Sequence, residues 1–416
     1  CRLFSLLYHI RRVVADLRSC KKSVFMRNEI YLFNPENDMA LANFTPYYKA
    51  PSEIIRMAND LSVLPAWYAP EGSTIKVDSL SRVSLWREQC PASDFLPDVI
   101  WSAEWENMPY KPWGWSPSLL YTLRKAGVND SFLLSDVQMG QIRVLSGRQC
   151  CVKILESFSR MDGLCGKAMT CNSMTQVKKY ITSLERCVLK APWSGSGRGI
   201  MYVSSKEWND SAEGWVSRVL RVQGEIMVEP LYNKVCDFAM EFYADGNGSV
   251  SFVGYSLFDT DAHGNYKGNF LLSDGQIKKI LSQYIPDEVF DNVCRTMEES
   301  LASLLNRGYC GFLGVDMMIC LEDGRYLLHP CVEINLRMNM GVVSHTIFNR
   351  YVHCLSHGKY IVKYYSEDGE AWDAFCQMKA TYKLHLCDGK LAEGYMPLTP
   401  VKQDTHYHAF LLLDRT

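Results

Sequence analysis

The sequence predicts a protein of mixed fold class, with a small α/β amino-terminal domain followed by an α+β unit. Its 416 residues exceed the roughly 250 residues at which a single hydrophobic core stops growing, so two or three packed units are expected. Residues 29–145 mix short apolar runs with helical stretches, which is typical of an α/β domain. Beyond residue 225 the apolar segments are longer and alternate with polar residues, which favours an antiparallel sheet.

The amino-terminal domain is expected to begin with a strand. Residues 30–33 form a short apolar run that stops at Asn34-Pro35, where a strand gives way to a loop or to the start of a helix. A helix is well marked further on, because Ser116 is a typical N-cap, Pro117 fills the first helical position and Gly127 follows the last turn. We therefore predict a single α/β domain over residues 29–145.

Polar residues directly follow the first predicted strand. They are Asn34, Glu36, Asn37 and Asp38. Open α/β sheets bind ligands beyond the carboxyl ends of their strands, so these side chains are candidates for a binding site. The same residue types also cap helices, and the sequence supports both interpretations equally.

The pattern changes at about residue 146. Helices are predicted over residues 151–160 and 286–306, and short strands at 168–170, 187–190, 201–203 and 225–228. Two alternating strands follow at 237–244 and 249–257. The dipeptide Asp323-Gly324 separates strands at 311–320 and 326–336, and Asp-Gly is a strong signal for a two-residue hairpin. A further hairpin is expected around Asp388-Gly389.

Composition argues against several classes of partner. The 44 Lys and Arg residues are balanced by 46 Asp and Glu residues, so no overall positive field draws the chain to nucleic acid or to an acidic membrane surface. No run of about 18 apolar residues occurs, and no membrane-spanning segment is expected. The 16 cysteines are scattered and lack metal-ligand spacing, which favours free thiols in a reducing, cytoplasmic compartment.

Residues 1–28 are interpreted as an extension of doubtful order. Within the first 25 residues several basic residues accompany the single acid Asp16, with apolar residues between them. Such a segment fits an amphipathic surface helix or a transit-like peptide. A third interpretation, which we favour, is that the functional protein begins at Met26, just before the first strand.

A glycine-rich segment follows Lys190. It consists of Ser194, Gly195, Ser196, Gly197, Arg198 and Gly199. A backbone of this composition bends freely and can direct successive N–H groups into one concavity, which is how such loops hold phosphate oxygens. The order differs from a P-loop, in which the lysine comes after the glycines, and from the dinucleotide fingerprint. Taken alone, the segment fits a surface loop behind a solvent-tipped lysine equally well.

The strand after the Asp-Gly turn carries a set of polar residues. Counting outward from the turn places Asp316 opposite Cys331 and diagonal to Glu333. Period-two alternation then puts Asp316, Glu333, Asn335 and Arg337 on one face. Two carboxylates and an amide oxygen suit Mg²⁺ carried by a polyphosphate, and Arg337 is placed to stabilise anionic charge. The alternative is a solvated face with incidental acids, but both strands are strongly apolar and buried acids without a metal are costly.

These motifs, in this order, resemble those of the ATP-grasp superfamily of ATP-dependent ligases. The family's marks are a strand lysine before a glycine-rich loop, a hinge strand with an acid, and a last strand that reads Glu-x-Asn-x-Arg. The matching segments are Lys190 with residues 194–199, Met227-Val228-Glu229-Pro230, Asp316, and Glu333-Ile334-Asn335-Leu336-Arg337. The resemblance covers roughly residues 146–350.

The resemblance implies an ATP-grasp fold, in which two α+β subdomains clasp ATP. It divides the chain into a pre-ATP-grasp domain (29–145), a small subdomain (146–228), a large subdomain (229–370) and carboxy-terminal strands that complete the fold (371–416).

The resemblance also implies a role for individual residues. Lys190 and the glycine-rich segment are expected to contact the ATP phosphates. Backbone groups of Glu229, Pro230 and Leu231 are expected to read the adenine edge, and Asp237 to reach the ribose. By the same resemblance Asp316, Glu333 and Asn335 hold one or two Mg²⁺ ions and Arg337 steadies an acyl phosphate. A further basic contact upstream of the loop is either Arg148 or Lys153.

The function implied is that of an ATP- and Mg²⁺-dependent carboxylate–amine ligase. Its substrates would be small-molecule or peptide carboxylates and amines, without nucleic acid or membrane partners, and an oligomer is possible. A kinase on the same scaffold, which gives a stable phosphorylated product, is the alternative among enzymes. A non-catalytic ATP-binding module is the alternative from a different class.

Overall fold

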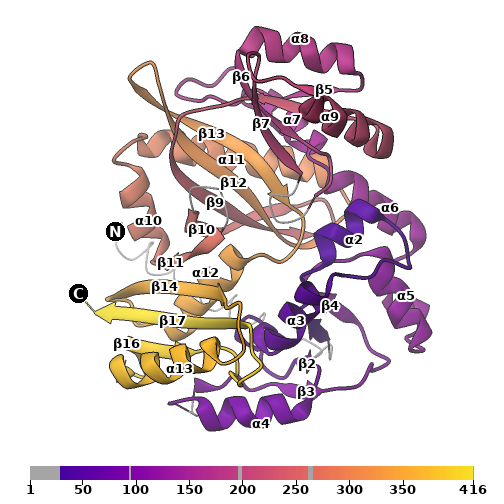
Figure 1. Ribbon diagram of the computed structural model, residues 1–416. Coiled ribbons are helices and arrows are strands. Elements are labelled where there is room, and N and C mark those ends of the chain that lie inside the picture. Colours follow the sequence, from indigo (N-terminus) through magenta and orange to yellow (C-terminus); the bar gives the residue numbers. More distant parts are fainter. Residues whose placement is uncertain (1–28, 93–94, 195–198, 261–265, 416) are drawn as a thin grey trace, which may run out of the picture.

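The computed structural model describes residues 29–92, 95–194, 199–260 and 266–415. The expectations for residues 1–28 and for Gly195, Ser196, Gly197 and Arg198 therefore lie outside the described residues. Figure 1 shows three regions: a small sheet at the top, a large sheet below it, and an amino-terminal unit beside the carboxy-terminal strands at the bottom. Among the helices that the structure describes, none combines the length and the apolar composition that a bilayer crossing demands.

The amino-terminal unit is built on a parallel sheet of four short strands in the order β3-β2-β1-β4. The strands are β1 (Ile30–Leu32), β2 (Thr74–Lys76), β3 (Ile100–Ser102) and β4 (Tyr110–Pro112). The helices are α2 (Asn37–Asn43), α3 (Ser52–Asp60), α4 (Leu80–Gln89), α5 (Pro117–Lys125) and α6 (Asp136–Leu145). The described residues of the unit also form the 3₁₀ turns η2 (Leu64–Trp67) and η4 (Asp130–Phe132). The predicted α/β class is confirmed, and the Ser116 hydroxyl caps α5 by accepting from the amide of Leu119.

The small sheet is antiparallel, with strand order β5-β8-β6-β7. Its strands are β5 (Met169–Cys171), β6 (Arg186–Lys190), β7 (Ile200–Ser204) and β8 (Ile226–Pro230). Helices α8 (Met174–Leu184) and α9 (Asp210–Gln223) supply apolar side chains to a core shared with the sheet. Because β8 continues to Pro230, it crosses the boundary predicted between residues 228 and 229, and both ends of this strand belong to the small sheet.

The large sheet has nine strands in the order β13-β12-β9-β10-β11-β14-β17-β16-β15, and each adjacent pair is antiparallel. The strands are β9 (Lys234–Asp245), β10 (Val250–Thr260), β11 (Tyr266–Leu271), β12 (Cys310–Glu322), β13 (Arg325–Asn335), β14 (Ser356–Tyr364), β15 (His385–Cys387), β16 (Lys390–Pro397) and β17 (Tyr407–Arg415). The accompanying helices are α7 (Gln149–Ser157), α10 (Asp274–Leu281), α11 (Asp287–Leu305), α12 (Met340–Tyr351) and α13 (Glu370–Thr381).

Helix α7 belongs to the core of the large sheet, although it was predicted as part of the small subdomain. Its buried residues Cys150, Cys151, Ile154 and Leu155 share one hydrophobic cluster with α11 and with strands β9, β12 and β13. The predicted two-subdomain arrangement is otherwise seen, with one antiparallel sheet facing another (Figure 1).

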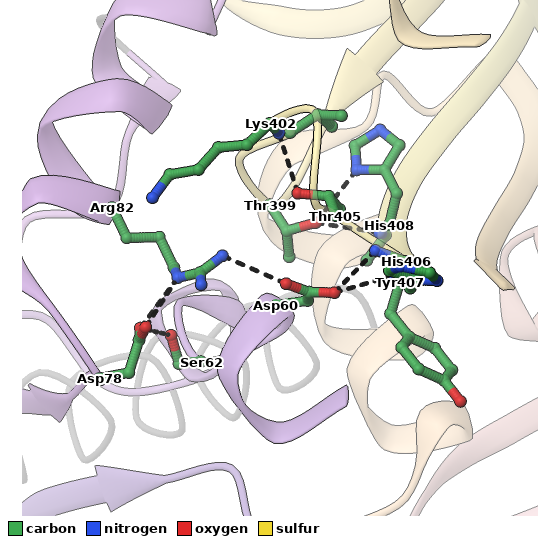
Figure 2. A network of polar contacts seen from close by, with 12 residues as sticks. Asp60, Ser62, Asp78, Arg82, Thr399, Lys402, Thr405, His406, Tyr407 and His408 are labelled. Carbon is green, nitrogen blue, oxygen red and sulfur yellow. Dashed lines mark hydrogen bonds and ion pairs between the residues drawn. The ribbon is translucent and has the colours of Figure 1, made fainter. Parts of the chain in front are cut away.

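A buried polar network joins the amino-terminal unit to strand β17 (Figure 2). Asp60, at the end of α3, accepts hydrogen bonds from the backbone amides of His406 (2.9 Å) and Tyr407 (3.0 Å). Arg82 on α4 contacts the same carboxylate and also pairs with Asp78 at 2.9 Å. Helices α3 and α4 are thereby held to the start of β17, and residues of the amino-terminal unit and of β17 also share one hydrophobic cluster.

Candidate functional site

The site lies on one face of the large sheet, and strand alternation explains why. On β9 the side chains of Phe238, Met240 and Phe242 are buried in the core with α11. The alternate positions, Asp237, Ala239 and Glu241, point to the opposite face. Register places polar residues of β10, β12 and β13 beside them, so this face forms the floor of a cleft.

The predicted acid pair is present, but its register differs from the prediction. Pairing outward from the turn follows the predicted count as far as Met318 opposite His329. A bulge then intervenes, and Asp316 lies directly opposite Glu333 instead of opposite Cys331. Pro330 falls in the bulge, and proline within a sheet is confined to such irregular positions because it has no N–H to donate to the ladder. The register shifts by two residues, which preserves the face, so the two acids are closer than predicted.

The local electrostatics reflect this close approach. Burial and the neighbouring Glu333 charge raise the pKa of Asp316 to about 7, against a hydrogen bond from Asn335 that lowers it. The Asn335 amide donates to Asp316 Oδ2 at 3.1 Å. Two carboxylates and an amide side chain thus meet at one point, and a divalent cation there would relieve the repulsion between the acids.

Arg337 connects this face to the amino-terminal unit. Its Nε and Nη2 bond both carboxylate oxygens of Asp38, at 2.7 and 2.6 Å, and Nη2 also donates to Asn335 Oδ1 at 3.1 Å. Burial alone would lower the pKa of Arg337, but the surrounding carboxylates outweigh it and the pKa is raised. Asp38 therefore acts as an anchor for Arg337. Its side chain does not cap α2, which has Glu36 at its N-cap without a side-chain bond.

Arg148, and not Lys153, is the basic residue at the site. It is 6% exposed, its Nη2 contacts Glu333 Oε1 at 2.7 Å, and its Nη1 donates to Ser194 Oγ and to the Ala191 carbonyl at 2.6 and 2.8 Å. Lys153, one turn further along α7, is exposed. Arg148 therefore joins the start of the glycine-rich segment to the acidic strand.

The described ends of the glycine-rich segment close onto each other. Ala191 donates its N–H to the Gly199 carbonyl at 2.8 Å. A Cβ at Gly199 would lie 2.3 Å from the Ser194 Cβ, so only glycine fits against that side chain. The segment therefore leaves and re-enters the sheet at nearly the same place, beside Arg148.

Lys190 and Glu229 form a buried ion pair between β6 and β8. The atoms Nζ and Oε2 are 2.6 Å apart, and the two side chains are only 7% and 8% exposed. Lys190 also donates to the Val332 carbonyl at 3.1 Å, within the bulge of β13 and one residue before Glu333. The lysine thus links the small sheet to the acidic strand from beneath the cleft.

The hinge residues expected to face the adenine and the ribose are Glu229, Pro230, Leu231 and Asp237. Pro230 and Leu231 continue from Glu229, but Leu231 already donates its N–H to the Arg186 carbonyl at 3.1 Å. That amide would have to exchange partners in order to read an adenine edge. Asp237 accepts from Lys234 and from the Thr260 hydroxyl, at 2.5 and 3.0 Å, and Thr260 lines the cleft.

A cleft of about 750 Å³ lies between the two sheets, and Lys190, Glu229 and Asp237 are not among its lining residues. Its lining includes the predicted residues Ser194, Asp316, Glu333, Asn335 and Arg337. It also includes residues that were not predicted or were left open, namely Asp38, Arg148, Glu241, Ser256, Tyr266, Asn269 and Asn339. Alternation along β9 could have identified Glu241, since it shares a face with the predicted Asp237.

No protein-family model matches the sequence, and no curated protein matches it. Among solved structures, N5-carboxyaminoimidazole synthetase from Staphylococcus aureus complexed with ADP is similar over 94% of this chain and 93% of its own, with 10% identity and a TM-score of 0.46. A biotin carboxylase–β-γ-ATP complex from Campylobacter jejuni is similar over 93% and 87%, with 10% identity and a TM-score of 0.49. The biotin carboxylase domain of 2-oxoglutarate carboxylase from Hydrogenobacter thermophilus, in complex with MgADP, has 11% identity and a TM-score of 0.49 over 94% and 86%. These likenesses concern the fold alone.

Proposed function

We propose that this chain is an ATP- and Mg²⁺-dependent ligase that activates a carboxylate as an acyl phosphate and joins it to an amine. The observation that carries the proposal is the convergence of Arg148, Arg337 and the facing pair Asp316–Glu333 around one cleft between two sheets. Cationic side chains next to paired acids suit a metal-bound polyphosphate, because the cations can bind the phosphate oxygens and the acids can bind the metal ion.

The nucleotide is proposed to lie between the small sheet and the floor of the cleft. Lys190, Arg148 and the segment of residues 194–199 would contact the phosphates. Backbone groups of residues 229–231 would face the adenine, and Asp237 the ribose. Arg148 contacts both the start of the segment and the acidic strand, and Lys190 contacts the acidic strand through the Val332 carbonyl, which supports a place for both near the phosphates.

The donor set fits Mg²⁺. Carboxylate and amide oxygens are its preferred ligands, and Asp316, Glu333 and Asn335 supply them from neighbouring strands. Burial, and after it the charge of Glu333, raises the pKa of Asp316, and a cation bound between the two acids would offset both effects. When bound, Mg²⁺ would neutralise the phosphate oxygens during transfer.

The reaction needs no protein nucleophile. A carboxylate oxygen of the substrate would attack the γ-phosphorus, the bond to the β-phosphate oxygen would break, and ADP would leave. The amine nitrogen would then attack the acyl carbon, phosphate would depart and the nitrogen would lose a proton. Arg337, held by Asp38, would bind the departing phosphate oxygens.

The test is release of ADP and phosphate over a panel of carboxylates combined with amines. We expect release only when both substrates are present together with Mg²⁺. Release with one substrate and a stable phosphorylated product would replace the ligase by a kinase. Nucleotide-dependent stabilisation without release over the whole panel would mark a non-catalytic binding module.

The same proposal assigns the chain to the cytoplasm, with small-molecule or peptide substrates. The cysteines that the structure describes are free thiols, which supports a reducing compartment.

A further inference from the structure

One wall of the cleft contains a carboxyl group that the nucleotide and metal assignments do not use. Glu241 on β9 is only 1% exposed, yet it lines the cleft. Register places it level with Gly314 on β12, and Gly314 level with Asn335 on β13. Glu241 therefore lies on the same face as the proposed metal ligands, two strands away from Asn335, which is roughly 10 Å across the sheet.

Two glycines make room for this carboxyl group. A Cβ at Gly341 would lie 2.0 Å from Glu241 Oε1, and a Cβ at Gly314 would lie 2.6 Å from Glu241 Oε2. Neither glycine has a positive φ. Their backbone conformations are therefore open to any residue, and what excludes a larger one is the space that the Glu241 carboxyl occupies.

The carboxyl group is held in position from one side. The Asn339 amide nitrogen donates to Glu241 Oε2 at 2.8 Å. The orientation of that amide is fixed, because Asn339 Oδ1 caps α12 by accepting from the amide of Val342 at 2.9 Å. The opposite oxygen, Oε1, flanks the same Gly341 position as the Ser256 hydroxyl.

The groups around Glu241 are otherwise neutral donors and acceptors. Ser256 Oγ accepts from the Asn269 amide at 2.7 Å, and Asn269 Oδ1 accepts from the Tyr266 hydroxyl. The bond from Asn269 uses one of the two lone pairs of the Ser256 hydroxyl, which leaves its proton and its second lone pair for a ligand. All three residues line the cleft.

No cationic side chain among the described residues that line the cleft pairs with Glu241. The two arginines in the lining are already bound to acids, Arg148 to Glu333 and Arg337 to Asp38. Burial raises the pKa of Glu241 to about 8; the hydrogen bond from Asn339 and the Arg337 charge lower it, and the Asp316 charge raises it. The carboxyl group is therefore mostly protonated at pH 7 in the free site, because a buried carboxylate is costly without a partner of opposite charge. A cationic ligand would supply that partner and favour the ionised form.

We propose that Glu241, with Ser256 and Asn339, forms the acceptor subsite of the cleft and binds the ammonium group of an amine substrate. This inference rests on the ligase function proposed above. It makes Glu241 a binding residue that places the amine beside the metal site. It predicts that acceptors enter as cationic primary amines, which lose one proton to water before the nitrogen attacks the acyl carbon.

The first experiment is independent of catalysis. The melting temperature is measured with increasing methylammonium chloride, against sodium chloride at equal ionic strength, for the wild type, Glu241→Gln and a matched Glu393→Gln control on the exposed side of β16. We expect saturable stabilisation by methylammonium in the wild type and control, and its loss in Glu241→Gln. Equal stabilisation of all three proteins, or of none, would overturn the inference.

The same variants report on the alternative that Glu241 is structural. Glutamine has the shape of glutamate and can still accept from Asn339, and like the protonated carboxyl group it buries no charge. We therefore expect Glu241→Gln to unfold at the same or a higher urea concentration than the wild type. A clear fall in the midpoint would show that the carboxyl group serves the fold, and would contradict the binding role.

The kinetic experiment separates this inference from the proposed function. Glu241→Gln should raise the KM for the amine about 10- to 100-fold, as expected for loss of a hydrogen bond to a charged group. The Kd of a non-hydrolysable Mg-ATP analogue should change less than about two-fold. If amine-dependent ADP release persists with an unchanged amine KM, the acceptor subsite is wrong and the ligase stands. If the wild type releases no ADP with any amine but methylammonium still stabilises it through Glu241, the ligase is wrong and the ammonium site stands.

Discussion

The buried ion pair between Lys190 and Glu229 offers the sharpest test of the site, because the two groups have both a structural and a proposed functional role. Their charged atoms are 2.6 Å apart and the side chains are 7% and 8% exposed. Removing one partner leaves the other charge buried and uncompensated, which typically costs about 3 to 5 kcal/mol. We expect Lys190→Met and Glu229→Leu each to lower the free energy of unfolding by that amount.

The double variant separates the two roles. Replacing both members of a buried pair by apolar residues of similar size is often neutral or stabilising. The Lys190→Met/Glu229→Leu protein should therefore regain most of the lost stability, with a coupling energy of roughly 3 kcal/mol or more between the two sites. It should not regain affinity for nucleotide, because the proposed phosphate contact of Lys190 is still missing.

Urea denaturation of the four proteins, monitored by tryptophan fluorescence, gives the stability cycle. Trp208 and Trp215 pack against the core of the small sheet, which contains the pair, and so report on this subdomain. Calorimetric titration with a non-hydrolysable Mg-ATP analogue gives the affinity. Single variants that lose less than about 1 kcal/mol would refute the buried-pair argument. A double variant that binds nucleotide like the wild type would show that Lys190 is purely structural.

Three further predictions concern other parts of the molecule. Asp38→Asn should release Arg337 and lower the ligation rate about 10- to 100-fold while the nucleotide Kd stays within about three-fold; a parallel loss of nucleotide affinity in calorimetry would contradict this. Burial lowers the pKa of His408 to about 3, so below pH 6.5 this histidine becomes protonated in the unfolded chain but stays neutral in the folded protein. Stability should accordingly fall by about 2 kcal/mol from this residue between pH 7.5 and pH 5, and His408→Gln should remove that share in urea midpoints measured at both values. Chelation of Mg²⁺ with EDTA should abolish the rise in melting temperature caused by the ATP analogue, and Asp316→Asn should weaken the Mg²⁺-dependent part of that rise; a rise that is insensitive to EDTA would rule out the metal site.

Local features of the fold were predictable from sequence because neighbouring residues encode them. Ser116 and Pro117 mark the start of α5, and the structure shows that cap. Asp323-Gly324 marks the hairpin, and both residues adopt the positive φ, 49° and 75°, that such a turn requires. The shared face of Asp316 and Glu333 was predicted correctly even though their register was not, because the bulge shifts the pairing by an even number of residues.

The long-range contacts that complete the site could not be predicted from the sequence. Arg148 and Lys153 are similar in charge and close along the chain, and only the packing of α7 against β13 turns the first into the cleft and leaves the second exposed. The pair Asp38–Arg337 spans most of the chain and depends on how the amino-terminal unit docks. Glu241 reads from sequence as one polar residue in an alternating strand.

The sequence by itself thus determined the order of the elements, the turn that forms the acidic hairpin and the identity of the residues on its polar face. These follow from caps, turn chemistry and strand periodicity, which act over a few residues. The tertiary structure decided which charges meet: Lys190 with Glu229, Arg148 with Glu333, and Arg337 with Asp38. Among the described residues, the hydrogen-bond partner of Glu241 is the neutral amide of Asn339. Pairing of buried charges depends on the desolvation and distance that packing imposes, and no local pattern in the chain encodes either.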